Sequence, residues 1–298
     1  MNTNTSGFEN IPTLSIFAII SSVKTALLIC LISLSITAGA EATAQERTGA
    51  YLGFDRNTYP GDANLKALHQ TFSYTGYWLN NPPGEKTNSW TGHRAAVESA
   101  GFGFLVLFNG REFAQLKTTA HATRLGRGDA VEALAAAHRE GFPVGTIIFL
   151  DQEQGGRMLP AQKAYIYAWV DAVIAAGFRA GIYCSGIPSP DDQNVVTAED
   201  IRKNAAGRKI VYWAINDACP PAPGCSFPAH PPSPAQSGVS FAEVWQFAQS
   251  PKEKDVAARC SGYSRDGECY APGIPLAQQL HVDVNSATSP DPSNGRTR

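Results

Sequence analysis

The segment that most constrains the fold of this chain is residues 145–156, which read GTIIFLDQEQGG. An unbroken apolar run, 147–150, leads into two carboxylates, Asp151 and Glu153, and then into a Gly-Gly turn. Such a run is typical of a strand that is buried on both faces. Side chains alternate along a strand, so Asp151 and Glu153 are expected to point to the same side. Two acids at the end of a buried strand are costly unless they are paired or used, and we interpret them as functional.

Seven further segments have the pattern of strands. With the opening one included, the predicted strands are residues 50–55, 74–79, 103–109, 147–150, 179–184, 210–216, 243–248 and 280–285. Apolar residues at helical spacing predict helices at residues 63–70, 90–100, 128–140, 160–176 and 197–204. The first five strands therefore alternate with helices, whereas loops join the last three.

This alternation favours a parallel sheet, and eight strands favour its closure into a barrel. The predicted fold class is α/β, an irregular TIM-type (β/α) barrel of five βα units followed by three β strands, over residues 48–286. An open doubly wound sheet is the alternative. No G-x-G-x-x-G or P-loop sequence stands at a strand-to-helix turn, which weighs against nucleotide binding. The polar segment 287–298 is expected to be a disordered tail.

Residues 1–44 have the layout of a secretory signal peptide. Lys24 precedes an apolar run at 26–36, and small residues at 38–40 and 42–44 offer cleavage sites. The run is too short and too rich in serine for a membrane span, although an uncleaved N-terminal anchor is an alternative. We therefore expect a secreted or periplasmic monomer with no stable membrane span after cleavage.

Charge and cysteine content narrow the class of protein. A formal net charge of -2 leaves no basic field for nucleic acid. Exported proteins can keep disulfides, and Cys219/Cys225 and Cys260/Cys269 are the natural pairs because each is close in sequence, although other connectivities remain open. Cys184 would be left over at a strand end. A zinc site is the alternative, but no His has the usual spacing to these cysteines, so we expect no metal or other cofactor.

Polar side chains gather at the predicted strand ends, where α/β barrels carry their chemistry. Four of them are acids: Asp55, Asp151, Glu153 and Asp283. Glycoside hydrolysis needs a protonated acid for the leaving oxygen and a carboxylate that stabilises or attacks the sugar. Aromatic faces stack on sugar rings, and amides bind hydroxyl groups. The expected substrate-binding residues are Tyr183, Trp213, Trp245, Gln246, Asn109, Asn285 and His281.

We expect Glu153 to be the general acid, because the charge of Asp151 would raise its pKa while Asp151 stays ionised. Asp55 and Asp283, on the strands that close the barrel, would hold the sugar or supply a base for water. Each acid also has a purely structural interpretation: Asp55 as a turn cap and Asp283 as half of a salt bridge. The functional interpretation therefore depends on the four acids lying together.

Six short motifs, at residues 53–55, 151–153, 181–183, 213–214, 244–247 and 282–285, follow a familiar order and spacing. Across residues 50–285 the chain resembles the GH25 lysozymes and, more closely, the exported bacterial Rv2525c-like glycoside hydrolase-like domain, formerly DUF1906. This resemblance implies a barrel of five βα units and three final strands, and cleavage of the muramic acid to glucosamine link of peptidoglycan. It also implies Glu153 as the acid, supported by Asp55, Asp151 and Asp283. The insertions at 217–238 and 250–274 depart from the compact lysozyme pattern and are expected to reshape or cover the cleft.

Two other functions fit parts of the sequence. A catalytically silent barrel would bind a glycan or a cell-envelope partner without turning it over. A phosphodiesterase barrel would need paired histidines and metal-binding carboxylates at the mouth. Of six histidines only His281 is well placed for that role, so we favour hydrolysis of a peptidoglycan-like polysaccharide.

Overall fold

The computed structural model describes residues 50–217, 230–249 and 262–297. The predicted signal peptide and its cleavage sites lie outside the described residues, as do Cys219, Cys225 and Cys260. Both predicted disulfides include at least one of these cysteines, so they stay predictions. Within the described residues, no helix has the length and apolar character that crossing a bilayer requires.

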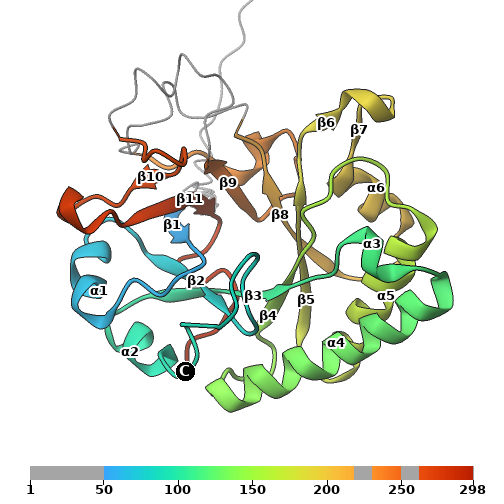
Figure 1. Cartoon of the computed structure of the whole chain (residues 1–298), viewed down its shortest axis with the longest axis horizontal. Helices are drawn as coiled ribbons and strands as arrows, with labels where there is room; N and C mark the ends of the chain where they lie inside the picture. The colour runs from blue at the N-terminus through green and yellow to red at the C-terminus, as the bar shows by residue number, and fades with distance from the viewer. Residues whose placement is uncertain (1–49, 218–229, 250–261, 298) are drawn as a thin grey trace, which may run out of the picture. The chain divides into compact units, whose positions relative to one another are not determined.

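Eight strands close into a barrel in the order β1-β2-β3-β4-β5-β8-β9-β11, and β11 pairs with β1 to complete the ring (Figure 1). A short strand, β10, pairs with β11 outside the ring. The barrel strands and β10 have these bounds: β1 Tyr51–Asp55, β2 Tyr74–Trp78, β3 Gly103–Asn109, β4 Ile147–Asp151, β5 Arg179–Ser185, β8 Ile210–Ile215, β9 Val244–Ala248, β10 Cys269–Tyr270 and β11 His281–Ala287.

Helices fill the first five connections of the barrel. They have these bounds: α1 Asp62–Leu68, α2 Arg94–Ser99, α3 Phe113–Leu116, α4 Thr119–Glu140, α5 Pro160–Ala175 and α6 Thr197–Asn204. A small hairpin of β6 (Pro188–Ser189) and β7 (Val195–Val196) precedes α6. The described parts of the connections after β8 contain no α-helix. The predicted fold class, five βα units followed by three strands, is therefore confirmed.

The direction of the last strand differs from the prediction of a parallel sheet. Neighbouring barrel strands from β1 to β9 are parallel, but β11 is antiparallel to both β1 and β9. β11 therefore begins at the barrel end where the other strands finish. Its register places Asp283 opposite Asp55, the last residue of β1.

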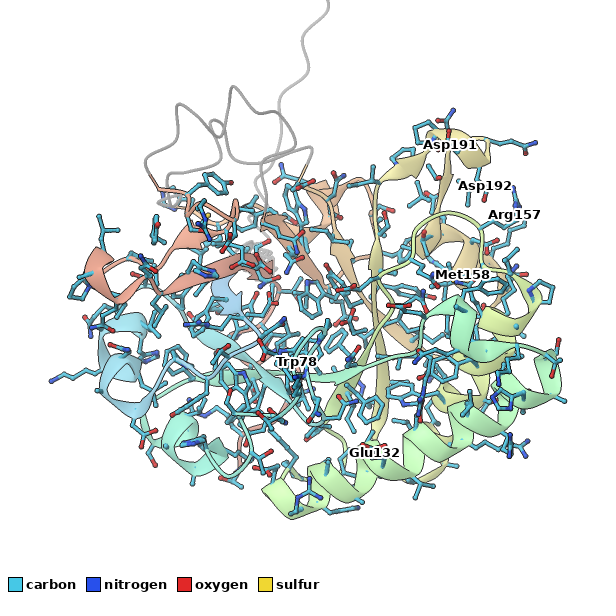
Figure 2. The ribbon with its side chains drawn as sticks, in the orientation of Figure 1. Trp78, Glu132, Arg157, Met158, Asp191 and Asp192 are labelled. Atoms are coloured by element: carbon cyan, nitrogen blue, oxygen red, sulfur yellow. The ribbon has the colours of Figure 1, made fainter. Side chains whose placement is uncertain are left out.

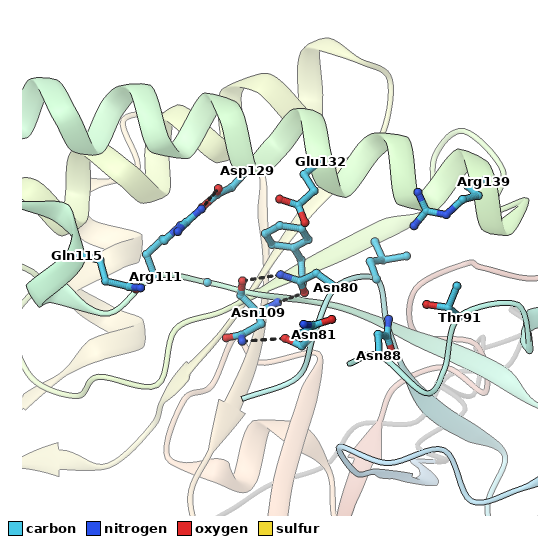
Figure 3. A pocket seen from close by; sticks show the side chains of 13 residues that line it. Asn80, Asn81, Asn88, Thr91, Asn109, Arg111, Gln115, Asp129, Glu132 and Arg139 are labelled. Carbon is cyan, nitrogen blue, oxygen red and sulfur yellow. Dashed lines mark hydrogen bonds and ion pairs between the residues drawn. The ribbon is translucent and has the colours of Figure 1, made fainter. Parts of the chain in front are cut away.

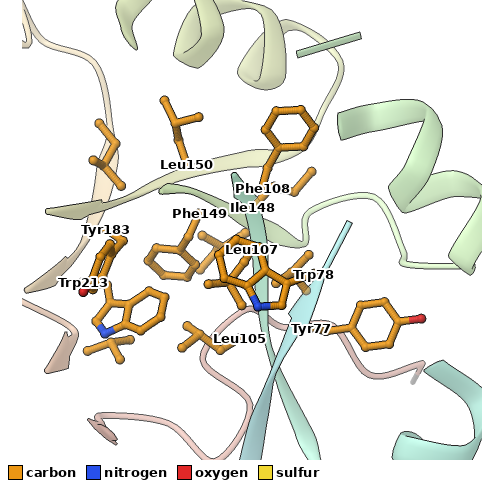
Figure 4. Close-up of a cluster of buried hydrophobic side chains, with 14 of the residues drawn as sticks. Tyr77, Trp78, Leu105, Leu107, Phe108, Ile148, Phe149, Leu150, Tyr183 and Trp213 are labelled. Carbon is orange, nitrogen blue, oxygen red and sulfur yellow. The ribbon is translucent and has the colours of Figure 1, made fainter. Parts of the chain in front are cut away.

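Aromatic side chains fill the barrel beneath this end. The Trp213 ring lies 6.0 Å from the Phe149 ring and 4.4 Å from the Tyr183 ring, centroid to centroid (Figure 4). The neighbouring strand makes room for them, since a Cβ on Gly181 would lie 2.4 Å from the Phe149 ring. Burial of each large side chain contributes about 1.5–3 kcal/mol, so this layer is a rigid support for whatever lies above it.

Helix α4 begins earlier than the predicted helix at 128–140. It starts at Thr119, where the Thr118 hydroxyl accepts a hydrogen bond of 3.2 Å from the His121 N–H. Gly126 and Gly128 obscure the helical pattern, because glycine costs about 1 kcal/mol in a helix. A Cβ on Gly126 would lie 2.3 Å from the carbonyl oxygen of Tyr165 in α5. Close packing of α4 on α5 therefore outweighs the low helix propensity.

The expectation of a disordered tail at 287–298 is wrong for its described residues. Ser293 binds two barrel strands at their amino-terminal halves: its carbonyl accepts from the Ile147 N–H at 2.7 Å, and its hydroxyl accepts from the Val106 N–H at 2.8 Å. Asp291 accepts from the Phe104 N–H at 2.8 Å. The composition looks disordered because it is polar, but these oxygens satisfy buried backbone donors at the bottom of the barrel.

We predict that Ser293→Ala lowers the free energy of unfolding by about 1–3 kcal/mol, because the buried Val106 N–H loses its acceptor. Urea denaturation of the purified protein measures this. Thr288→Ala, an exposed change in the same segment, is the control and should stay within about 0.5 kcal/mol of wild type. Equal stability of the two variants would contradict a structural role for the tail.

Candidate functional site

A pocket of about 370 Å³ lies at the barrel end where β11 begins, and all four predicted acids line it. Asp55 and Asp151 end their strands, Glu153 follows β4, and Asp283 belongs to β11. Its apolar and aromatic lining residues include Trp78, Leu107, Tyr183 and Trp213, which Figure 4 shows in the buried cluster of the barrel.

One glutamine links the two acids on the closing strands. The Gln246 amide nitrogen donates to Asp55 Oδ1 at 3.0 Å and to Asp283 Oδ2 at 3.3 Å. Its orientation is fixed because the Tyr183 hydroxyl donates to Gln246 Oε1 at 2.7 Å. The Asn285 amide adds a second bond to Asp55 Oδ1 at 2.6 Å. The network therefore holds both carboxyl groups at the pocket wall.

Both acids of this pair keep protons more tightly than ordinary aspartates do. Burial raises the pKa of Asp55 to about 7, although the bonds from Asn285 and Gln246 lower it in part. Burial, followed by the charges of Asp55 and Glu268, raises the pKa of Asp283 well above its usual range. Two adjacent carboxylates in a buried site disfavour each other's ionisation, so the pair retains a proton near neutral pH.

The second pair of acids differs from the expectation that Asp151 stays ionised beside a protonated Glu153. Asp151 is only 6% exposed, and its Oδ1 is buried with no hydrogen-bond partner in the described part of the chain. Burial, then the charges of Glu153 and Asp55, raise the pKa of Asp151 well above its usual range. Glu153 is more exposed, and burial followed by the charge of Glu112 raises its pKa. Desolvation, rather than repulsion between the two acids, is thus the main cause in both cases.

The loop that carries Glu153 is held by the segment between β5 and β8. The Arg157 N–H donates to Asp192 Oδ2 at 2.6 Å, and the Thr197 hydroxyl donates to the Gly156 carbonyl at 3.0 Å. Arg157 and Asp192 also form an ion pair of 3.5 Å, and Figure 2 shows them together at the β6–β7 edge of the molecule. These contacts fix the backbone of the loop that carries Glu153.

Most of the predicted substrate-binding residues lie in or under the pocket. Tyr183, Trp213, Gln246 and His281 line it. Asn285 lies beneath, where its Oδ1 accepts from the Trp213 indole at 3.0 Å. His281 forms a hydrogen bond with Glu268 through Nδ1.

The structure does not bring Trp245 or Asn109 to this pocket. Trp245 is buried, and its indole donates to the Asn216 carbonyl at 3.0 Å. It neighbours Gln246 on β9 and so faces the opposite side of the strand. Asn109 donates to the Asn81 carbonyl at 2.9 Å and lines a separate cavity of about 470 Å³ beneath α4 (Figure 3).

The pocket also contains residues that the sequence analysis missed. Trp78 ends β2, and its place at a strand end is the same sequence signal that identified Asp55. Arg56 follows Asp55 directly and lies just outside the predicted strand 50–55. Gln249 and Glu268 lie in segments without strand or helix pattern, and no sequence signal singles them out. The missed lining residues with polar or aromatic side chains are Arg56, Asn57, Thr58, Trp78, Glu85, Gln249 and Glu268.

A third hollow lies between the acid pocket and the cavity under α4 and shares lining residues with each. The acid pocket shares Pro83 and Glu153 with this hollow of about 540 Å³, which in turn shares Asn109 and Arg111 with the cavity under α4. This arrangement suits a long ligand. In the part of the chain that the structure describes, no group of three or more His, Cys, Asp or Glu is arranged to hold a metal ion.

The raised pKa of Asp55 predicts how stability depends on pH. The folded protein keeps a proton up to about pH 7 that the unfolded chain releases near 3.8, so this group makes stability fall as pH rises between these values. We expect Asp55→Asn to remove that cost and to raise the free energy of unfolding at pH 8 by roughly 2 kcal/mol. Urea denaturation at pH 5 and 8 measures it, with the exposed Asp191→Asn as control. A loss of stability at pH 8 would contradict the raised pKa.

No curated protein matches the sequence. A crystal structure of an uncharacterized B. stearothermophilus protein is similar, with 20% identity, a TM-score of 0.50, and coverage of 80% of this chain and 95% of that one. The Tat-secreted protein Rv2525c of Mycobacterium tuberculosis, in complex with L-tartrate, has 13% identity, a TM-score of 0.49, and coverage of 83% and 98%. A Streptococcus pneumoniae virulence factor, the glycosyl hydrolase 25 GHIP, has 11% identity, a TM-score of 0.49, and coverage of 82% of this chain and 89% of that one.

At such identities structural likeness speaks for the fold alone, and the family follows from the sequence match. Residues 73–220 match the model of the Rv2525c-like, glycoside hydrolase-like domain. This segment runs from just before β2 to just after β8 and includes Asp151 and Glu153. The chain therefore carries an Rv2525c-like, glycoside hydrolase-like domain.

Proposed function

We propose that this protein is an exported glycoside hydrolase that cleaves glycosidic bonds in peptidoglycan or another cell-envelope polysaccharide. The observation that carries the proposal is one pocket in which four carboxyl groups meet above an aromatic floor. Glycosidases need two carboxyl groups in different protonation states and a surface that packs against a sugar ring. The adjoining hollows favour a polymer over a small saccharide as substrate.

Glu153 acts as the general acid. It is the most exposed of the four acids, and its raised pKa keeps a proton available for the glycosidic oxygen. As the bond from the anomeric carbon to that oxygen breaks, the proton stays with the leaving sugar. The positive charge on the other sugar then needs a carboxylate. The Asp55–Asp283 pair, which holds a proton that it can release near neutral pH, supplies that carboxylate or activates water, and Asp151 binds the sugar.

Export and location follow from the predicted signal peptide at 1–44. Rv2525c, a protein with which this chain shares its domain family, is described as Tat-secreted. We propose a secreted or periplasmic monomer whose substrate is the wall polymer outside the membrane. Neither the mechanism nor the pocket calls for a cofactor.

The second candidate is a barrel that binds a glycan without cleaving it. Asp151 and Asp283 each have a buried Oδ1 with no hydrogen-bond partner among the described residues, which disfavours ionisation of either acid. A site whose acids stay protonated would still bind sugar hydroxyls. Release of reducing ends from purified peptidoglycan separates the two candidates, because only the hydrolase produces them.

We predict that Glu153→Gln lowers the rate of reducing-end release at least about 100-fold, because the leaving oxygen loses its proton donor. Binding to the insoluble polymer, measured by co-sedimentation, should persist. Glu199→Gln, an exposed change in α6, is the control and should hydrolyse like wild type. Full activity in Glu153→Gln would rule out its role as the acid.

Glu112 tunes this acid through its charge. We predict that Glu112→Gln lowers the pKa of Glu153, so the activity lost at high pH is lost at a lower pH than in wild type. The amide oxygen can still cap α3, which keeps the loop folded. The alkaline limb of the pH profile of kcat measures the shift, with Glu132→Gln as control. An unmoved limb would show that another group limits the rate.

A further inference from the structure

Arg56 stands at the edge of the acid pocket on a fixed backbone. It follows Asp55, and its own carbonyl accepts from the Trp78 indole at 3.2 Å and from the Trp90 indole at 3.3 Å. Two tryptophans therefore hold the main chain from which the side chain enters the pocket lining. Because the backbone is fixed, the guanidinium can reach only a limited range of positions. This restriction favours recognition of a ligand at a defined place.

The guanidinium of Arg56 forms no ion pair or hydrogen bond with any residue that the structure describes. Its Nε is sealed from solvent, so the two terminal nitrogens are the donors left for the pocket. Other half-buried arginines of this chain are paired: Arg111 with Asp129 at 2.6 Å, and Arg208 with Asp171 at 2.7 Å. Arg56 is thus a half-buried cation with unused donors in the pocket.

The surroundings of Arg56 are rich in carboxyl groups but do not neutralise it. Among the described residues, Glu268 is the charged group that acts on it, and that carboxylate is hydrogen-bonded to His281. Burial lowers the pKa of Arg56, which reflects the cost of holding this charge without a partner. A guanidinium with two free terminal nitrogens binds a carboxylate through parallel hydrogen bonds. A carboxylate on the ligand would therefore give the Arg56 guanidinium the partner that the described residues do not provide.

We propose that Arg56 is a specificity residue that binds a carboxylate on the sugar held in the acid pocket, so that the protein prefers an acidic polysaccharide to a neutral one. The inference rests on the proposed function for the glycan nature of the ligand. Because the buried acids retain protons, an anionic ligand meets less repulsion than the number of carboxyl groups suggests.

The test uses two forms of one polymer. Peptidoglycan strands stripped of their peptides carry a free lactyl carboxylate on every muramic acid unit, and methylamidation of the same strands removes that charge. Calorimetric titration into Glu153→Gln protein measures binding without turnover. We expect the parent to bind the acidic strand at least about tenfold more tightly, and a second change, Arg56→Gln, to abolish the difference by weakening acidic-strand binding alone.

Arg56→Lys should keep part of the preference, because it keeps the charge without the paired donors. Arg179→Gln, an exposed change at the start of β5, is the matched control and should keep the preference in full. Equal affinity for both strands, an equal loss on both in Arg56→Gln, or binding of neither strand would overturn the proposal. If selective binding is found but wild type releases no reducing ends, the proposed hydrolase function fails while the role of Arg56 stands.

Discussion

The site depends on the antiparallel pairing of β11 with β1, which places Asp283 opposite Asp55 and closes the barrel at the same time. Parallel strands alone would bring only their carboxyl ends to the mouth. The reversed strand adds its first residues, so His281 lies at the rim, Asp283 at the wall and Asn285 below. Gln246, on the strand at the other side of β11, then reaches both acids. The same strand pairing therefore closes the barrel and brings the two acids together.

The same burial that shapes the pocket sets its chemistry and costs stability. Three aspartates sit where water is largely excluded, and their pKa values are raised mainly for that reason. A site of this kind destabilises the fold at neutral pH, because the folded state must either keep protons or bury charge. Burial of the positively charged Arg56 costs stability as well, and it lowers the pKa of this side chain. Groups of this kind cluster at functional sites, where a bound ligand supplies the hydrogen bonds and charges that the excluded solvent cannot supply.

Much of this fold and site was predictable from local pattern, and the failures have physical causes. Apolar runs located all eight barrel strands, and the residues at or near their ends included all four carboxyl groups. The direction of β11 is set by the path of segments without periodicity. On a strand buried on both faces, such as β9, alternation tells that Trp245 and Gln246 diverge but not which of them faces the barrel. The 288–297 segment is polar because it supplies oxygens to buried N–H groups. Arg56 lies outside the predicted elements, and its backbone is held by Trp78 and Trp90, which are distant in sequence.

The central claim is that the closing strands place two aspartates where they hold a proton near neutral pH. Titration of the protein with ¹³C-labelled aspartate carboxyl groups, followed by NMR, tests it most directly. Assignment comes from Asp55→Asn, Asp151→Asn and Asp283→Asn. The account predicts a carboxyl signal of Asp55 that changes with a midpoint near pH 7, and signals of Asp151 and Asp283 whose midpoints lie well above the usual range of aspartates. Complete ionisation of all three by pH 5 would contradict it.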